Sequence, residues 1–217
     1  MRRILPFLMM TLVLVTLPVA STAAAGHGGG GTTNPRTVCV DAGHGGTDPG
    51  ATYFGLHEKD LTLDIAGRLQ ALLLSNGYNV VMTRTGDQTL GNTDRATICN
   101  NGGADTVLSI HLNAASDPSV DYFKAFYGKQ IKDRTFTQTI WNNYNLTRPD
   151  GTGLLQKSGI AQFASGLLLK TSAPASLAET VFLSNPAEAG ALADGTGGRQ
   201  QAIAQQLFNG LVAWYNR

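Results

Sequence analysis

The sequence predicts a single-domain α/β fold in which a twisted, mostly parallel sheet is flanked by helices on both faces. β-branched apolar segments alternate with helix-like segments from residue 36 to residue 110, and the joins between them are short. The chain has 217 residues, of which 42% are hydrophobic and 14% are charged, which suits one globular core and excludes a disordered chain. Right-handed crossovers between such strands bring their carboxyl ends to one edge of the sheet.

The individual elements follow from hydrophobic spacing. The helix over 58–75 is the clearest, because leucine and isoleucine recur every three or four residues and Asn76-Gly77 follows as a stop signal. The first half of the chain alternates strand and helix, at residues 36–41, 58–75, 78–83, 93–101 and 104–110. The second half contains a strand at 121–127, helices at 130–143 and 199–215, a loop at 148–159 and a mostly apolar run at 174–183. Residues 164–169 suit a strand or a helix.

The start of the chain is predicted to lie outside this domain. Met1-Arg2-Arg3 is basic, residues 4–20 are almost wholly apolar, and the small residues at 21–25 suit cleavage, which is the order of a secretory signal peptide. The alternative is an uncleaved membrane anchor, because the apolar run approaches spanning length. Residues 26–35 have the composition of a flexible glycine-rich linker, and residues 36–217 form the folded domain. We therefore expect export to the periplasm or the cell wall.

The charge balance limits the partners of the mature chain. The 16 basic residues include Arg2 and Arg3, so 14 would remain after cleavage against 15 acidic residues. Such a balance gives no basic face for nucleic acid. No further long apolar run follows the leader, so we expect the mature chain to be soluble and to need no membrane. We also expect a monomer with no nucleic-acid partner.

Two cysteines, Cys39 and Cys99, leave two alternatives open. Export permits a disulfide between them. However, Cys39 lies in a predicted buried strand and Cys99 in a predicted helix, where free cysteines are often simply buried. The sequence favours two buried thiols. The two residues lack the close paired spacing of a thiolate zinc site.

Four side chains are predicted to gather at one edge of the sheet. His44 stands in a glycine-rich loop directly after the first strand, and His111 follows the third strand. Glu58 opens the helix that follows the first strand, where the helix dipole also favours a carboxylate. Glu179 is the single acid in the apolar run at 174–183, so it is either a salt-bridged acid at a strand end or a functional carboxylate.

These residue types suit metal-assisted hydrolysis. Two imidazoles and one carboxylate make a common catalytic zinc shell that leaves a position for water. A second carboxylate near that water can take its proton and pass it to a leaving amine. The set is sufficient to hydrolyse an amide with one Zn²⁺ ion, although histidine and carboxylate also suit other divalent ions.

The order and spacing of several segments, from about residue 37 to residue 214, resemble the zinc-dependent N-acetylmuramoyl-L-alanine amidases. The segments that carry the resemblance are Asp41-Ala42-Gly43-His44-Gly45-Gly46, Asp48-Pro49-Gly50-Ala51, Glu58-Lys59-Asp60, Thr83-Arg84, Ser109-Ile110-His111-Leu112-Asn113-Ala114 and Glu179-Thr180-Val181-Phe182-Leu183-Ser184-Asn185. The resemblance implies that residues 36–217 are a catalytic amidase domain with a mixed α/β sheet. It implies that His44, Glu58 and His111 bind zinc, and that Glu179 is the catalytic carboxylate. The implied substrate is the amide between N-acetylmuramic acid and L-alanine in peptidoglycan.

The chain departs from the family pattern in two places. Thr180 and Val181 follow Glu179, where the family usually has an apolar residue and then glycine. The segment 113–157 shows no long extra helix of the kind that occludes the site in some relatives, so we expect an open, constitutively active domain.

Further residues near these segments have two interpretations each. His57 could replace its neighbour Glu58 as a ligand, but only one of the two can reach the metal, and the family pattern favours Glu58. Asp41 either accepts a hydrogen bond from a ligand histidine or forms a polar end to the first strand. Asn113 and Arg84 either bind substrate or brace loops.

Two alternative functions remain on the sequence alone. A zinc peptidase could cut within the stem peptide, although the His-Glu-x-x-His helix of common metallopeptidases is missing from the sequence. A non-catalytic wall-binding module could hold zinc or glycan without turnover.

Overall fold

A computed structural model describes residues 35–217. The predicted signal peptide and all but the last residue of the predicted linker lie outside the described residues. The main sheet contains β1 (Thr37–Ala42), β4 (Asn79–Met82), β5 (Thr106–Asn113), β6 (Tyr122–Tyr127), β7 (Gln156–Gln162) and β8 (Ala175–Phe182). The helices are α1 (Glu58–Ser75), α2 (Asn92–Asn101), α3 (Lys132–Asn143), α4 (Gly166–Lys170), α5 (Pro186–Leu192) and α6 (Gly198–Tyr215).

The sheet has the strand order β4-β1-β5-β8-β6-β7 and is mostly parallel. Strands β4, β1, β5 and β8 run in one direction, and β6 pairs with β8 antiparallel. Strand β7 is parallel to β6, with α3 between them in the chain. The predicted convergence of the carboxyl ends of β1 and β5 follows from their parallel register, in which Ala42 lies opposite Ile110.

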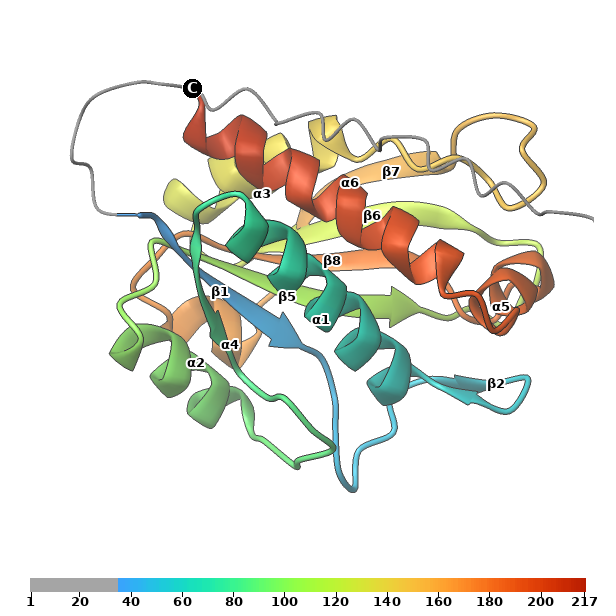
Figure 1. Ribbon diagram of the computed structural model, residues 1–217, viewed down its shortest axis with the longest axis horizontal. Coiled ribbons are helices and arrows are strands. Elements are labelled where there is room, and N and C mark those ends of the chain that lie inside the picture. Colours follow the sequence, from blue (N-terminus) through green and yellow to red (C-terminus); the bar gives the residue numbers. More distant parts are fainter. Residues whose placement is uncertain (1–34) are drawn as a thin grey trace, which may run out of the picture. The chain divides into compact units, whose positions relative to one another are not determined.

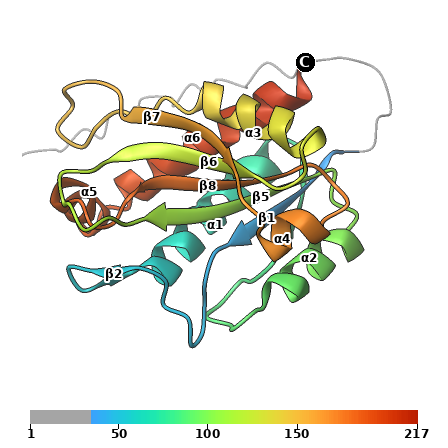
Figure 2. The ribbon, with the colours of Figure 1, turned by 180° about the vertical axis from the view of Figure 1, so that it is seen from behind.

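Helices cover both faces of the sheet, which confirms the predicted fold class. Helices α1, α3 and α6 pack together on one face (Figure 1), over a core of alternate strand residues such as Val40, Ile110 and Ala178. The other face carries α2 and α4 (Figure 2), over a smaller core that includes Cys39, Val107 and Leu177. Side chains alternate between the two faces along β5 and β8, so His111 and Glu179 lie on this second face, beyond the smaller core.

Several element bounds differ from the sequence prediction. Strand β5 continues through His111 to Asn113 instead of ending at residue 110, because its backbone remains paired with β8. Part of the predicted loop at 148–159 is strand β7, whose polar residues gave no strand signal, and residues 166–170 form helix α4. The short helix α5 and the hairpin described next were not predicted.

A small hairpin precedes α1 (Figures 1 and 2) and is formed by β2 (Thr52–Tyr53) and β3 (Leu56–His57). Its base is closed by the backbone N–H of Glu58, which donates to the carbonyl of Ala51 at 2.9 Å. The two residues at its tip, Phe54 and Gly55, have φ angles of 53° and 78°, as a tight primed turn requires. Phe54 is 61% exposed.

The favoured prediction of two free thiols was wrong. Cys39 and Cys99 form a disulfide with an S–S distance of 2.03 Å and a Cα–Cα distance of 5.4 Å, and it ties β1 to α2. Both residues are fully buried. Hydrophobic spacing identifies each as a core residue but does not show that α2 packs over that particular position of β1.

Removal of this disulfide is expected to lower the free energy of unfolding by roughly 2–5 kcal/mol, because the bond closes a loop of 60 residues in the unfolded chain. The Cys39→Ala/Cys99→Ala variant should unfold at lower denaturant than the wild type under oxidising conditions. The wild type treated with reductant serves as the matched control and should move towards the variant. Equal unfolding midpoints for variant and oxidised wild type would contradict the prediction.

Among the described residues, no helix combines the length and apolar character needed to cross a membrane.

Candidate metal centre

The glycine loop after β1 brings three side chains together. His44 has a φ of 59°, and the loop then returns through Gly50 at φ 65°. A Cβ on Gly43 would lie 2.4 Å from the His111 ring, and one on Gly50 would lie 2.6 Å from an oxygen of Glu58. Glycine is therefore required at both positions for the three side chains to converge.

The converging atoms are Nε2 of His44, Nδ1 of His111 and Oε1 of Glu58. The His44–His111 distance is 3.1 Å, the His111–Glu58 distance is 3.0 Å, and the His44–Glu58 distance is 3.1 Å. Within the described part of the chain these three residues form the group of histidine and carboxylate side chains able to hold a metal ion. The sequence predicted all three residues, and the structure brings them together.

The geometry of this triangle fits a tetrahedral metal. Zinc bonds of about 2.0–2.1 Å to nitrogen and oxygen place neighbouring ligands about 3.3 Å apart. The three atoms are therefore already spaced as one face of a tetrahedron, which leaves the fourth corner for water or substrate. The donor set of two imidazoles and one carboxylate suits zinc.

Hydrogen bonds fix the orientation of the ligands. Nδ1 of His44 lies 2.8 Å from an oxygen of Asp48, which leaves Nε2 free for the metal. Glu58 accepts hydrogen bonds from the backbone N–H of Leu112 at 3.0 Å and of Ala51 at 2.9 Å. Asp48 was not singled out from the sequence. Its position four residues after a ligand histidine, in the same loop, was the available signal.

Asp41 does not accept a hydrogen bond from a ligand histidine, which corrects the functional interpretation of this residue. Its buried carboxylate pairs with Arg95 at 2.8 Å and accepts hydrogen bonds from Thr83 and Ser109. Burial alone would raise the pKa of Asp41, but the Arg95 charge and these hydrogen bonds lower it. Arg95 also donates to the carbonyl of His44 at 2.6 Å, so Asp41 supports the ligand loop through Arg95.

His44 and Glu58 each stabilise the charged form of the other. Burial disfavours the charged form of His44, but the Glu58 carboxylate, with help from Asp48, raises its pKa to about 9. Burial likewise disfavours the Glu58 carboxylate, but hydrogen bonds to His111 and His44 move its pKa far below the usual range. The Glu58 carboxylate therefore favours a positive charge at His44 when no metal is bound.

Glu179 lies beside the triangle. It is opposite His111 in the parallel pairing of β5 with β8. Its Oε2 atom is buried and has no hydrogen-bond partner within the described chain. Burial raises the pKa of this carboxyl, and the charges of His111, Glu58 and His44 act on it as well. A half-buried carboxyl with one buried oxygen that lacks a partner is costly, which is typical of a group kept for chemistry.

The remaining candidates have other surroundings. His57 is exposed, and its ring contacts the hydroxyl of Thr52 at 3.1 Å, outside the triangle. Arg84 is 2% exposed and donates to the backbone carbonyls of Ala42 and Gly43, among others, so its contacts are those of a loop brace. Asn113 is half-buried, and its side-chain oxygen accepts from the N–H of Ala114 at 2.8 Å.

A cavity of about 310 Å³ adjoins the triangle. Aromatic, apolar and polar residues share its wall, which is suited to a ligand with both characters. Its lining residues are Asp41, His44, Asp48, Leu90, Gly91, Asn92, Arg95, His111, Phe163, Ser165 and Leu177.

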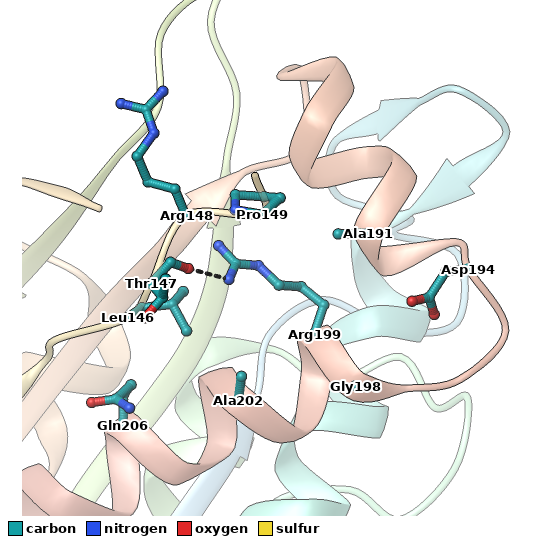
Figure 3. A pocket seen from close by; sticks show the side chains of 10 residues that line it. All are labelled: Leu146, Thr147, Arg148, Pro149, Ala191, Asp194, Gly198, Arg199, Ala202 and Gln206. Carbon is teal, nitrogen blue, oxygen red and sulfur yellow. Dashed lines mark hydrogen bonds between the residues drawn. The ribbon is translucent and has the colours of Figure 1, made fainter. Parts of the chain in front are cut away.

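A second cavity of about 310 Å³ lies between residues 146–149 and the start of α6 (Figure 3). There Arg199 donates to the carbonyl of Thr147 at 2.6 Å and pairs with the buried Glu188 on α5. Burial raises the pKa of Glu188 to about 7, although the Arg199 charge opposes this shift. Its lining residues include none of the three candidate ligands, whereas His44 and His111 both line the first cavity.

An α/β sheet with an open triangle of histidine and carboxylate side chains at its carboxyl edge, able to hold a metal ion, is typical of metal-dependent hydrolases. The comparisons with known proteins narrow this class. Residues 38–213 match the family described as N-acetylmuramoyl-L-alanine amidase, and the chain belongs to that family.

Individual relatives agree with this assignment. The chain is 34% identical over 182 residues to the sporulation-specific N-acetylmuramoyl-L-alanine amidase of Bacillus subtilis, an alignment that covers 82% of this chain and 68% of the relative. Among solved structures, amidase AmiC2 of Nostoc punctiforme has a TM-score of 0.75 and 27% identity, with 84% of this chain and 98% of that chain covered. An amidase from Clostridium difficile 630 has a TM-score of 0.75 and 29% identity, with 85% and 98% covered.

Proposed function

We propose that this chain hydrolyses the amide between N-acetylmuramic acid and L-alanine in peptidoglycan, with one zinc ion held by His44, Glu58 and His111. The observation that carries the proposal is the pairing of the open ligand triangle with the unpartnered carboxyl of Glu179 beside it. Family membership supplies the amide that is cut.

The metal and the side chains around it have distinct roles in the proposed hydrolysis. When bound, the zinc ion would lower the pKa of a water molecule and polarise the scissile carbonyl. Glu179 takes the proton of the attacking water and passes it to the leaving amine of L-alanine, a role that suits the raised pKa of its carboxyl. Asp48 and the backbone N–H groups of Leu112 and Ala51 keep the ligands in place. Asn113, on the same face of β5 as His111, is proposed to bind substrate.

The test is a digest of purified peptidoglycan with and without a chelator, read by mass spectrometry. Intact stem peptides with free L-alanine amino ends, released only with metal, are the expected products. Cuts inside the stem would favour a zinc peptidase instead. Retention on the wall without any cut would make the chain a binding module.

Binding of zinc at pH 7 is expected to release about one proton, because the ligand must be a neutral imidazole and His44 carries a proton in the metal-free protein. Because the pKa of His44 is raised to about 9, zinc must displace a proton at any lower pH. The apparent affinity for zinc should therefore rise roughly tenfold per pH unit as the pH increases towards 9. Calorimetric titration in buffers of different ionisation enthalpy measures the released proton. Zinc binding that is independent of pH between 7 and 9 would contradict this prediction.

The proposed setting is the cell wall, after export of the chain and removal of residues 1–25. The basic, apolar and small-residue order of the leader supports export. We also propose a monomer that is active without a partner. The activity without a partner is supported by α3, the helix of segment 113–157, which packs with α6 on the face away from His111 and Glu179. Amino-terminal sequencing of the secreted protein and its mass in solution test both statements.

A further inference from the structure

The residue of interest is Lys124, which extends the row of functional side chains across the sheet. His111 lies opposite Glu179 in the pairing of β5 with β8, and Glu179 lies opposite Lys124 in the antiparallel pairing of β8 with β6. Partners in register project from the same face of a sheet. The three residues therefore form a row in the order metal ligand, carboxylate and ammonium group.

The ammonium group of Lys124 has no ionic partner in the described chain. The lysine ion pairs within 4.0 Å among the described residues are those of Lys59 and Lys129, so Lys124 does not pair with Glu179 although the two lie directly across two strands, where opposite charges stabilise a sheet. Its Nζ atom instead lies 5.4 Å from the centroid of the Phe126 ring. Lys124 is half-buried, unlike Lys132, which is exposed on α3.

The aromatic neighbours connect Lys124 to the cavity beside the metal centre. The rings of Phe126 and Phe163 are 5.6 Å apart, and Phe163, which is 50% exposed, lines that cavity together with His44 and His111. A half-buried cation next to an open aromatic wall provides a site for a group that is anionic and carried on an organic chain.

The order of the row indicates which part of the substrate meets Lys124. This step rests on the proposed function. The scissile carbonyl belongs at the ligand triangle, and Glu179 gives its proton to the leaving amine, so the leaving peptide extends from Glu179 towards Lys124. Stem peptides are acidic. We propose that Lys124 binds a stem-peptide carboxylate beyond L-alanine and thereby selects stems with a free carboxylate over amidated ones.

The test compares two soluble muramyl peptides that differ only in a free carboxylate or a carboxamide on the residue after L-alanine. In Lys124→Met, the KM for the carboxylate substrate should rise about tenfold, with kcat within about twofold and little change for the carboxamide. Lys124→Arg should keep most of the preference, and Lys132→Met is the matched surface control. An equal effect of Lys124→Met on both substrates, or no effect, would overturn the inference.

A binding measurement separates this inference from the proposed function. The released peptides, in carboxylate and carboxamide form, are titrated into the zinc-loaded wild type and Lys124→Met. Tighter binding of the carboxylate peptide that depends on Lys124 supports the inference even if neither muramyl peptide is cleaved, which would defeat only the proposed function. If the wild type cleaves both substrates equally and binds both peptides equally, the inference fails and the proposed function stands.

Discussion

The Glu179→Gln variant is expected to lose about 10²–10⁴-fold in kcat while it keeps its metal. Glutamine has nearly the same shape but cannot take a proton from water or deliver one to the leaving amine. The triangle of His44, His111 and Glu58 does not use Glu179 as a ligand, so zinc content should stay unchanged. Initial rates on peptidoglycan and elemental analysis of the same preparation are the two measurements.

The same variant should be no less stable than the wild type when both are free of metal. Burial raises the pKa of Glu179, so the folded state disfavours the carboxylate, and this cost is absent at low pH and grows as the pH rises through the ordinary pKa of a glutamate. Glutamine removes that cost at pH 7. Thermal unfolding at pH 7 measures the difference. Full turnover by Glu179→Gln would show that another group is the base, and a large loss of stability would show a structural role.

The His111→Ala variant is expected to lose both zinc and activity. It removes one corner of the triangle and leaves the buried Glu58 carboxylate without the histidine 3.0 Å away. Stoichiometric zinc should be lost on dialysis, and hydrolysis should fall to the level of the chelated wild type. Elemental analysis after dialysis, followed by a digest with added zinc, measures both effects.

Two further variants provide zinc affinities with which the loss in His111→Ala can be compared. Asp48→Ala keeps all three ligands but removes the hydrogen bond to Nδ1 of His44, so its affinity for zinc should fall about 10–100-fold. His57→Ala alters the exposed neighbour of Glu58, outside the triangle, and should bind zinc as the wild type does. If His57→Ala loses zinc and His111→Ala keeps it, the ligand assignment is wrong.

The sequence alone was sufficient to predict those features that depend on a regular residue pattern within one or two elements. Helix α1 begins and ends at the predicted residues because its apolar spacing is regular and Asn76-Gly77 ends it. The meeting of His44 with His111 followed from parallel strands, which share one carboxyl edge. Glu179 was noticed because a single acid in an apolar strand is costly unless it has a use.

The sequence was insufficient where the outcome depends on which elements pack together. The disulfide needs α2 to lie over Cys39, and the pairing of Asp41 with Arg95 needs the same helix at the same edge. Each strand of the hairpin has two residues, which is too short for any period to show. Lys124 gained its meaning only from the register of β6 with β8, which joins residues 55 positions apart.

The tip of the hairpin formed by β2 and β3 is a site where added segments can be inserted. Its base is fixed by the bond from Glu58 to Ala51 and by the N–H of Lys59, which donates to the carbonyl of Pro49 at 3.1 Å. At the tip, apart from Gly55 and its two neighbours in the chain, no heavy atom of residues 35–217 lies within 4 Å of where a Cβ on Gly55 would stand. Residues inserted there should leave the first turn of α1, with the candidate metal ligand Glu58 at its start, in place. A wall-binding peptide grafted at this tip would therefore change where the enzyme works without rebuilding the centre that does the chemistry.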